Sequence, residues 1–210
     1  MPYRHIFCFA ISVFFSSRLA HATDMPGGLV QISEGLKKET YEFVISPGYV
    51  MSPTGAYLSA DMRVQPNQDI GAGFAFGAGE VGFHVGAHAT WYVLPDVESQ
   101  PAFSVTGGLY INRLQKDNAK DNYFVVKVSP VISKTLPLSW GSVTPYSGLN
   151  LAPSFRLDQA QNEFSVKGSF GMMTSIKSLS GIRLWTEFGI GVWNSVHELV
   201  FGLSYPFSAI

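Results

Sequence analysis

The chain has 210 residues, a formal net charge of -1 and 14% charged residues, well below the roughly 25% that is usual in soluble domains. This length suits one domain with a full core and excludes two domains of ordinary size. The near-neutral charge and the lack of a basic cluster exclude the usual nucleic-acid-binding surface, and no stretch beyond the N-terminal region reaches the ~18 apolar residues of a membrane-spanning helix.

The N-terminal residues have the pattern of an export signal. The basic residue Arg4 precedes an apolar stretch over 6–15, which is followed by the small-residue cleavage pattern Ala-His-Ala at 20–22. We therefore predict a signal peptide over residues 1–22. An uncleaved anchor is the alternative, but the apolar stretch is short for spanning a membrane. The single cysteine, Cys8, lies in this segment, so disulfides cannot hold the mature chain together.

Residues 23–40 precede the first predicted strand. They contain a Gly-Gly pair at 27–28 and a stretch over 33–40 that is rich in Glu and Lys. We expect a periplasmic N-terminal segment here. A solvated tail is favoured, as is usual for terminal segments, while a short helix and a plug inside the barrel remain open.

The rest of the chain alternates between apolar and polar residues in about ten segments separated by turn residues, which is typical of a membrane β-barrel. The predicted strands cover residues 41–51, 55–64, 69–77, 80–94, 101–113, 122–136, 143–156, 163–176, 182–193 and 196–207. We predict an all-β fold over residues 41–210, an antiparallel up-and-down transmembrane β-barrel of about ten strands, with eight or twelve also open.

A soluble β-sandwich is the main alternative fold, because its strands alternate in the same way. The barrel is favoured for two reasons. The apolar face is present on every segment, and aromatic residues such as Trp91 and Trp193 lie near strand ends, as in the aromatic girdle of a membrane barrel.

The connections between the predicted strands are short. Those at the end away from the termini lie near residues 52–54, 78–79, 114–122, 158–162 and 194–195. Barrels that bind receptors or carry large active sites outside the membrane generally use longer loops. Short loops therefore argue against adhesin-like and protease-like roles.

Two of these turns test the alternation independently. The turn at 78–79 would place Gly73 opposite His84, and the turn at 194–195 would place Gly191 opposite Glu198. In both hairpins small or polar residues then face small or polar residues. A slip of one residue would mix the two faces, so the agreement supports the barrel.

The polar face is expected to line the lumen, and its charges nearly balance. The predicted lumen charge network consists of Glu42, Asp61, Arg63, Lys127, Arg156, Lys167, Arg183, Glu187 and Glu198. Charges in a narrow lumen must pair or be hydrated, so a side-chain-filled interior and a thin water-filled channel are both possible. One expected pair is Arg156 with Glu163.

His84 and His88 are the first candidates for chemistry. On a strand, residues four apart are separated by roughly 13 Å, too far to bind a common metal ion. We therefore expect polar lumen residues here, with no metal or cofactor site.

Ser195, His197 and Glu198 have the residue types of a lipid hydrolase. A nucleophile needs its base within hydrogen-bond reach and a third group that orients the base. Residues 195 and 197 share one side of a strand whereas residue 198 points to the other. We expect no catalytic residues and a protein that is not an enzyme.

The last predicted strand contains Gly202, with Tyr205 and Phe207 three and five positions later. It resembles the C-terminal targeting strand of bacterial outer-membrane β-barrel proteins. The resemblance implies a location in the outer membrane, surrounded by its lipid. It also implies insertion by the barrel assembly machinery, with periplasmic chaperones acting during export.

The function expected from these features is that of a small outer-membrane barrel with a structural or interaction role and a side-chain-filled lumen. A narrow pore for small solutes or ions is the first alternative, because the lumen is polar. A lipid-directed hydrolase is the second.

Overall fold

A computed structural model describes most of the chain that the sequence assigns to the barrel. The described residues are 42–52, 55–65, 70–79, 82–97, 99–116, 119–158, 162–179 and 182–208. The predicted signal peptide (1–22) and N-terminal segment (23–40) lie outside these ranges. Across the described ranges, no helix is long and apolar enough to cross a membrane.

The described chain contains eleven strands and one short 3-10 helix. The strands are β1 (Glu42–Ser52), β2 (Gly55–Gln65), β3 (Ile70–Gly79), β4 (Gly82–Leu94), β5 (Ala102–Lys116), β6 (Ala119–Ser133), β7 (Leu136–Leu138), β8 (Gly141–Arg156), β9 (Asn162–Ile176), β10 (Arg183–Trp193) and β11 (Glu198–Ser208); the helix is η1 (Lys177–Leu179). The predicted loop over 114–122 is wrong, because β5 and β6 extend toward each other through most of it.

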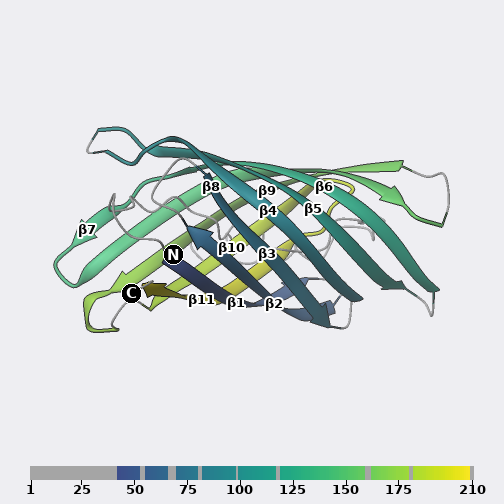
Figure 1. The fold of residues 1–210 in the computed structure, drawn as a ribbon, viewed down its shortest axis with the longest axis horizontal. Helices are drawn as coiled ribbons and strands as arrows, with labels where there is room; N and C mark the ends of the chain where they lie inside the picture. The colour runs from purple at the N-terminus through teal and green to yellow at the C-terminus, as the bar shows by residue number, and fades with distance from the viewer. Residues whose placement is uncertain are drawn as a thin grey trace, which may run out of the picture.

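The strands form one antiparallel sheet that curls into a barrel (Figure 1). Neighbours in sequence pair from β1 to β6 and from β8 to β11. The ring is completed by β6 with β8 and by β1 with β11, where Glu42 lies opposite Ser208. This confirms the predicted all-β, up-and-down barrel.

The short strand β7 prolongs β6. Ser133 of β6 lies opposite Tyr146 of β8, and the N–H of Lys134 donates to the carbonyl of Pro145 at 3.1 Å. Leu136 of β7 then lies opposite Val143 in the same register. Counted once with its continuation β7, β6 is one of ten strands that the described residues form around the barrel, which matches the sequence-based count.

The predicted partners in the β3–β4 hairpin are wrong, although the predicted faces are right. Gly79 lies opposite Gly82, so the turn comes two residues later than expected. His84 consequently lies opposite Gly77 and not Gly73. The displacement is an even number of residues, so every side chain keeps its face.

The last hairpin shows the same kind of displacement. Glu198 lies opposite Gly189 and not Gly191. The connection from β10 to β11 includes Asn194 at a φ of 44°, a left-handed conformation that Asn tolerates better than most residues. This connection has room for more residues than the predicted two-residue turn, which accounts for the shift in pairing.

Exposure alternates along the strands and is reversed relative to a soluble protein. On β4 and β5 the outward side chains are apolar and exposed, among them Phe83, Val85, Trp91, Leu109 and Ile111. The inward side chains on the same strands are buried and polar, namely His84, His88, Thr90, Ser104, Thr106 and Asn112. An apolar exterior around a polar interior is the arrangement of a transmembrane barrel.

Candidate lumen site

The structure directs six of the nine predicted lumen charges inward, because they lie on the same strand faces as the buried polar residues. These are Lys127, Arg156, Lys167, Arg183, Glu187 and Glu198. The other three are described by their backbone pairing alone. Asp61 lies opposite Ser46, Arg63 lies opposite Gly73, and Glu42 is at the start of β1.

The most deeply buried charges form an ion pair across the lumen wall. Lys167 Nζ of β9 lies 2.8 Å from Glu198 Oε1 of β11, and both side chains have 0% exposure. The strand between them, β10, carries Gly189 opposite Glu198. Because a glycine stands there, the two long side chains can meet over the intervening strand.

A second contact follows the same pattern one strand earlier. The hydroxyl of Tyr146 in β8 donates to Glu187 Oε2 in β10 at 3.1 Å. The intervening strand carries Gly171, where an added Cβ would lie 2.4 Å from the Tyr146 hydroxyl. The glycines of β9 and β10 thus let inward polar side chains lie flat against the wall.

A row of polar residues continues this arrangement around the wall. Thr90 Oγ1 and Thr106 Oγ1 are 2.8 Å apart, and Thr106 lies opposite Ser129. Ser129 donates to Asn150 Oδ1 at 2.6 Å, and Asn150 lies opposite Lys167. The row therefore runs from β4 to β9 through adjacent strands. It ends at the Lys167–Glu198 ion pair.

Several buried polar atoms on this wall have no hydrogen-bond partner within the described ranges. They include Asn150 Nδ2, Ser169 Oγ, Trp185 Nε1 and Glu198 Oε2. Buried polar groups in proteins are nearly always hydrogen-bonded. These atoms are therefore buried polar groups of the wall whose hydrogen-bonding capacity is not used within the described ranges.

The lumen also contains an apolar cluster; the sequence places Tyr146 and Trp185 on the lumen face, but the grouping of these rings with apolar neighbours was not predicted. Its buried members are Val131, Tyr146, Met173, Trp185 and Val200. The apolar members occupy inward positions of otherwise polar strand faces. Their signal was available in the sequence, since each shares its parity with neighbouring polar residues. The interior is consequently part polar and part apolar.

The expected partner of Arg156 is wrong. Arg156 of β8 forms an ion pair with Asp121 of β6, and its side chain and that of Asp121 are 21% and 27% exposed. Glu163 lies opposite Ser154 instead. Arg156 is the last residue of β8, and the closing pairing of β8 with β6 brings Asp121 beside it.

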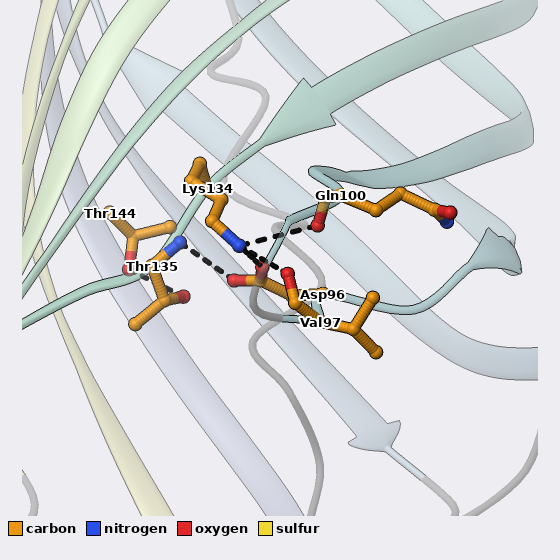
Figure 2. A network of polar contacts seen from close by, with 6 residues as sticks. All are labelled: Asp96, Val97, Gln100, Lys134, Thr135 and Thr144. Carbon is orange, nitrogen blue, oxygen red and sulfur yellow. Dashed lines mark hydrogen bonds and ion pairs between the residues drawn. The ribbon is translucent and has the colours of Figure 1, made fainter.

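A further polar network lies at the end of the barrel that holds the β4–β5 connection (Figure 2). Lys134 Nζ lies 2.7 Å from Asp96 Oδ1 and also donates to the carbonyls of Val97 and Gln100. The N–H of Thr135 donates to Asp96 Oδ2 at 2.7 Å. These contacts anchor the connection to the segment between β6 and β7.

This rim network sets the protonation of its carboxylate. Burial acts to raise the pKa of Asp96, but the hydrogen bonds from Lys134 and Thr135 and the positive charge of Lys134 outweigh it. The pKa of Asp96 therefore lies below the ordinary value of 3.8. Asp96 is in a loop outside the barrel strands, and nothing in the sequence pattern marks its contact with Lys134.

The residues considered for a lipid hydrolase are arranged differently from a catalytic triad. The N–H of Gly191 donates to Nδ1 of His197 at 3.2 Å. A base oriented by a carboxylate must donate from that nitrogen, whereas here it accepts. Glu198, the acidic member of the set, pairs with Lys167 inside the barrel.

The targeting residues lie in the last strand. Gly202 and Tyr205 of β11 lie opposite Gly48 and Ile45 of β1. Phe207 lies opposite Phe43. The three positions expected for the targeting pattern therefore belong to the strand that completes the ring.

Comparisons with known proteins add one structural similarity. No family model and no curated protein matches the sequence. Among solved structures, the chain is similar to a protein described as "KdgM porin", with a TM-score of 0.40 and 11% identity over 78% of this chain and 99% of that chain. The strand pairings of this chain define its architecture.

Proposed function

We propose that the protein is a small β-barrel of a bacterial outer membrane that provides a narrow pore for small solutes or ions. The observation that carries this proposal is the reversed distribution of side chains. Exposed apolar side chains such as Leu109 and Phe170 cover the outer wall, while polar ones such as Asn150 and Ser169 line the inner wall. This arrangement suits a hydrated path through an apolar medium.

The polar character of the lumen favours passage over a purely structural role. Filling an interior with charged groups is costly, and well-packed apolar residues often replace buried ion pairs without loss of stability. This barrel nevertheless buries Lys167, Glu187 and Glu198. Unpartnered polar atoms such as Ser169 Oγ are suited to contacting water or a solute.

A structural or interaction role with a filled lumen is the second candidate. It is favoured by the complete burial of Lys167 and Glu198 and by the apolar cluster around Trp185. In that case the ion pair and the cluster would together act as a packed core. Neither candidate involves catalysis.

Export and assembly form part of the same proposal. The signal-like residues 1–22 would direct export, and the pattern of Gly202, Tyr205 and Phe207 would engage the barrel assembly machinery after escort by periplasmic chaperones. Outer-membrane lipid would then surround the exposed apolar wall. Membrane fractionation, with heat-dependent mobility on a denaturing gel, tests this location: a protein found in the soluble periplasmic fraction would contradict it.

Single-channel recording separates the two candidates. The full-length mature protein, folded into planar bilayers and checked for heat-dependent mobility, should give small and reproducible conductance steps in KCl. An inserted, folded barrel that never conducts above the lipid background would support the filled-lumen candidate instead.

A further inference from the structure

The exposure of ion pairs falls from both ends of the barrel toward its interior. Near one end, the Arg156 and Asp121 side chains are 21% and 27% exposed. At the other end, the side chain of Lys134 is 30% exposed in its pair with Asp96. The Lys167–Glu198 pair between these ends has 0% exposure on both sides. The terminal pairs are therefore partly exposed, whereas the interior pair is fully buried.

The groups around the interior pair are buried as well. Asn150, directly opposite Lys167, has 0% exposure, and Ser169, opposite Gly189, has 2%. Glu198 Oε2 is buried and has no hydrogen-bond partner in the part of the chain that the structure describes. The ion pair thus combines complete burial with a carboxylate oxygen that has no hydrogen-bond partner among the described residues.

From this geometry we infer that the Lys167–Glu198 ion pair is the constriction of the lumen and sets its ion selectivity. The inference rests on the pore proposed above and deepens it. At close range a fixed charge controls which ions pass a narrow opening. With both charges present they offset each other, and the constriction passes small uncharged polar solutes and discriminates little between small cations and anions.

Removal of either charge should expose the other. Without the ammonium group of Lys167, the Glu198 carboxylate stands alone at the constriction and favours cations. Without the carboxylate, Lys167 favours anions. A second acid, Glu187, is inward-facing one strand away but is held by the Tyr146 hydroxyl. It remains unchanged in both variants, so the difference between them reports on the pair.

The test is the reversal potential of single channels in a KCl gradient, with heat-dependent mobility as the check on folding. Lys167→Met should raise the cation-to-anion permeability ratio severalfold, and Glu198→Gln should lower it severalfold. The charge swap, Lys167→Glu with Glu198→Lys, should return the ratio close to that of the wild type. Conducting single variants whose ratios do not move in opposite directions would overturn the inference.

Variants of the rim pair provide the matched control. Asp96→Asn and Lys134→Met each remove one charge from an ion pair with the same 2.7 to 2.8 Å geometry, but at the barrel end. Their permeability ratios should equal that of the wild type. Rim variants that shift selectivity as much as the interior ones would overturn the assignment of the constriction to Lys167 and Glu198.

A double variant covers the case in which an unpaired buried charge prevents folding. Lys167→Met with Glu198→Gln removes both charges of this pair together, and it should increase conductance severalfold because the bridge between β9 and β11 is gone. An unchanged conductance overturns the inference. If the wild type does not conduct but the double variant does, the proposed resting pore is rejected and the constriction is supported. If neither protein conducts, both the pore and the constriction are rejected.

Discussion

Gly189 lies directly opposite Glu198, and a Cβ added to this glycine would stand 2.6 Å from Glu198 Cγ. That spacing is closer than non-bonded carbon atoms approach in folded proteins. The ion pair between Lys167 and Glu198 therefore depends on the absence of a side chain on the strand between them. Gly171 has the same relation to Tyr146, with an added Cβ 2.4 Å from the Tyr146 ring.

Gly189→Ala should destabilise the barrel by about 1–3 kcal/mol, the usual range for overpacking a filled interior. Urea unfolding in lipid vesicles measures this change. Gly107→Ala is the matched control, because a Cβ there meets nothing within 4 Å, and it should stay within about 0.5 kcal/mol of the wild type. Equal effects of the two substitutions would mean that the space above Gly189 is not needed.

Tyr146→Phe should destabilise the barrel by about 1–3 kcal/mol, because it leaves the buried Glu187 carboxylate without the hydroxyl that donates to it. The same unfolding assay applies. A double-mutant cycle with Glu187→Gln should give a coupling energy within the ~0.5–3 kcal/mol found for residues in contact. Strictly additive effects would show that the two side chains do not stabilise each other.

The β4–β5 connection should loosen in acid. The pKa of Asp96 is lowered by the hydrogen bonds and charge that hold it, so its contribution to stability is fully present above the ordinary value of 3.8 and is lost as the pH falls through the lower folded value. Limited proteolysis of this connection by an acid-active protease should therefore increase below about pH 3.8. Asp96→Asn should remove this dependence; an unaltered pH profile in Asp96→Asn would argue against the anchor.

Leu109→Arg should destabilise the folded barrel far more than the exposure of Leu109 suggests. Leu109 is 54% exposed and lies in the middle of β5. A basic residue on the lipid-facing side near the membrane centre costs about 2–4 kcal/mol. Val97→Arg is the control, since Val97 is 49% exposed but lies in the end loop. Folding into vesicles measures both, and tolerance of both changes would indicate that water surrounds the wall at Leu109.

The faces of the strands could be predicted from the sequence because they depend on parity alone. Gly73 and Gly77 both occupy lumen-facing positions of β3. Mistaking one for the other as the partner of His84 therefore left the lumen assignment intact. The position of the turn depends on backbone conformation. The connection over 194–197, with Asn194 at a positive φ, is longer than the two-residue turn that the sequence pattern predicts.

The contacts of the candidate site could not be predicted in the same way. Lys167 and Glu198 belong to strands that are not neighbours, so their meeting depends on how the barrel staggers β9, β10 and β11. Arg156 likewise finds Asp121 through the pairing of β6 with β8, which closes the ring. A hairpin-by-hairpin interpretation contains no information about such long-range stagger.

The pairing of β1 with β11 has a consequence for biogenesis. Within the described residues, the facing backbone edges of these two strands pair with each other, and a sheet edge left open inside hydrocarbon is strongly unfavourable. In a membrane, β1 must therefore stay shielded from lipid until β11 pairs with it. Loss of β11 would leave two unpaired sheet edges and not a smaller closed barrel. Such a chain should be a target for degradation or for aggregation by strand pairing between molecules.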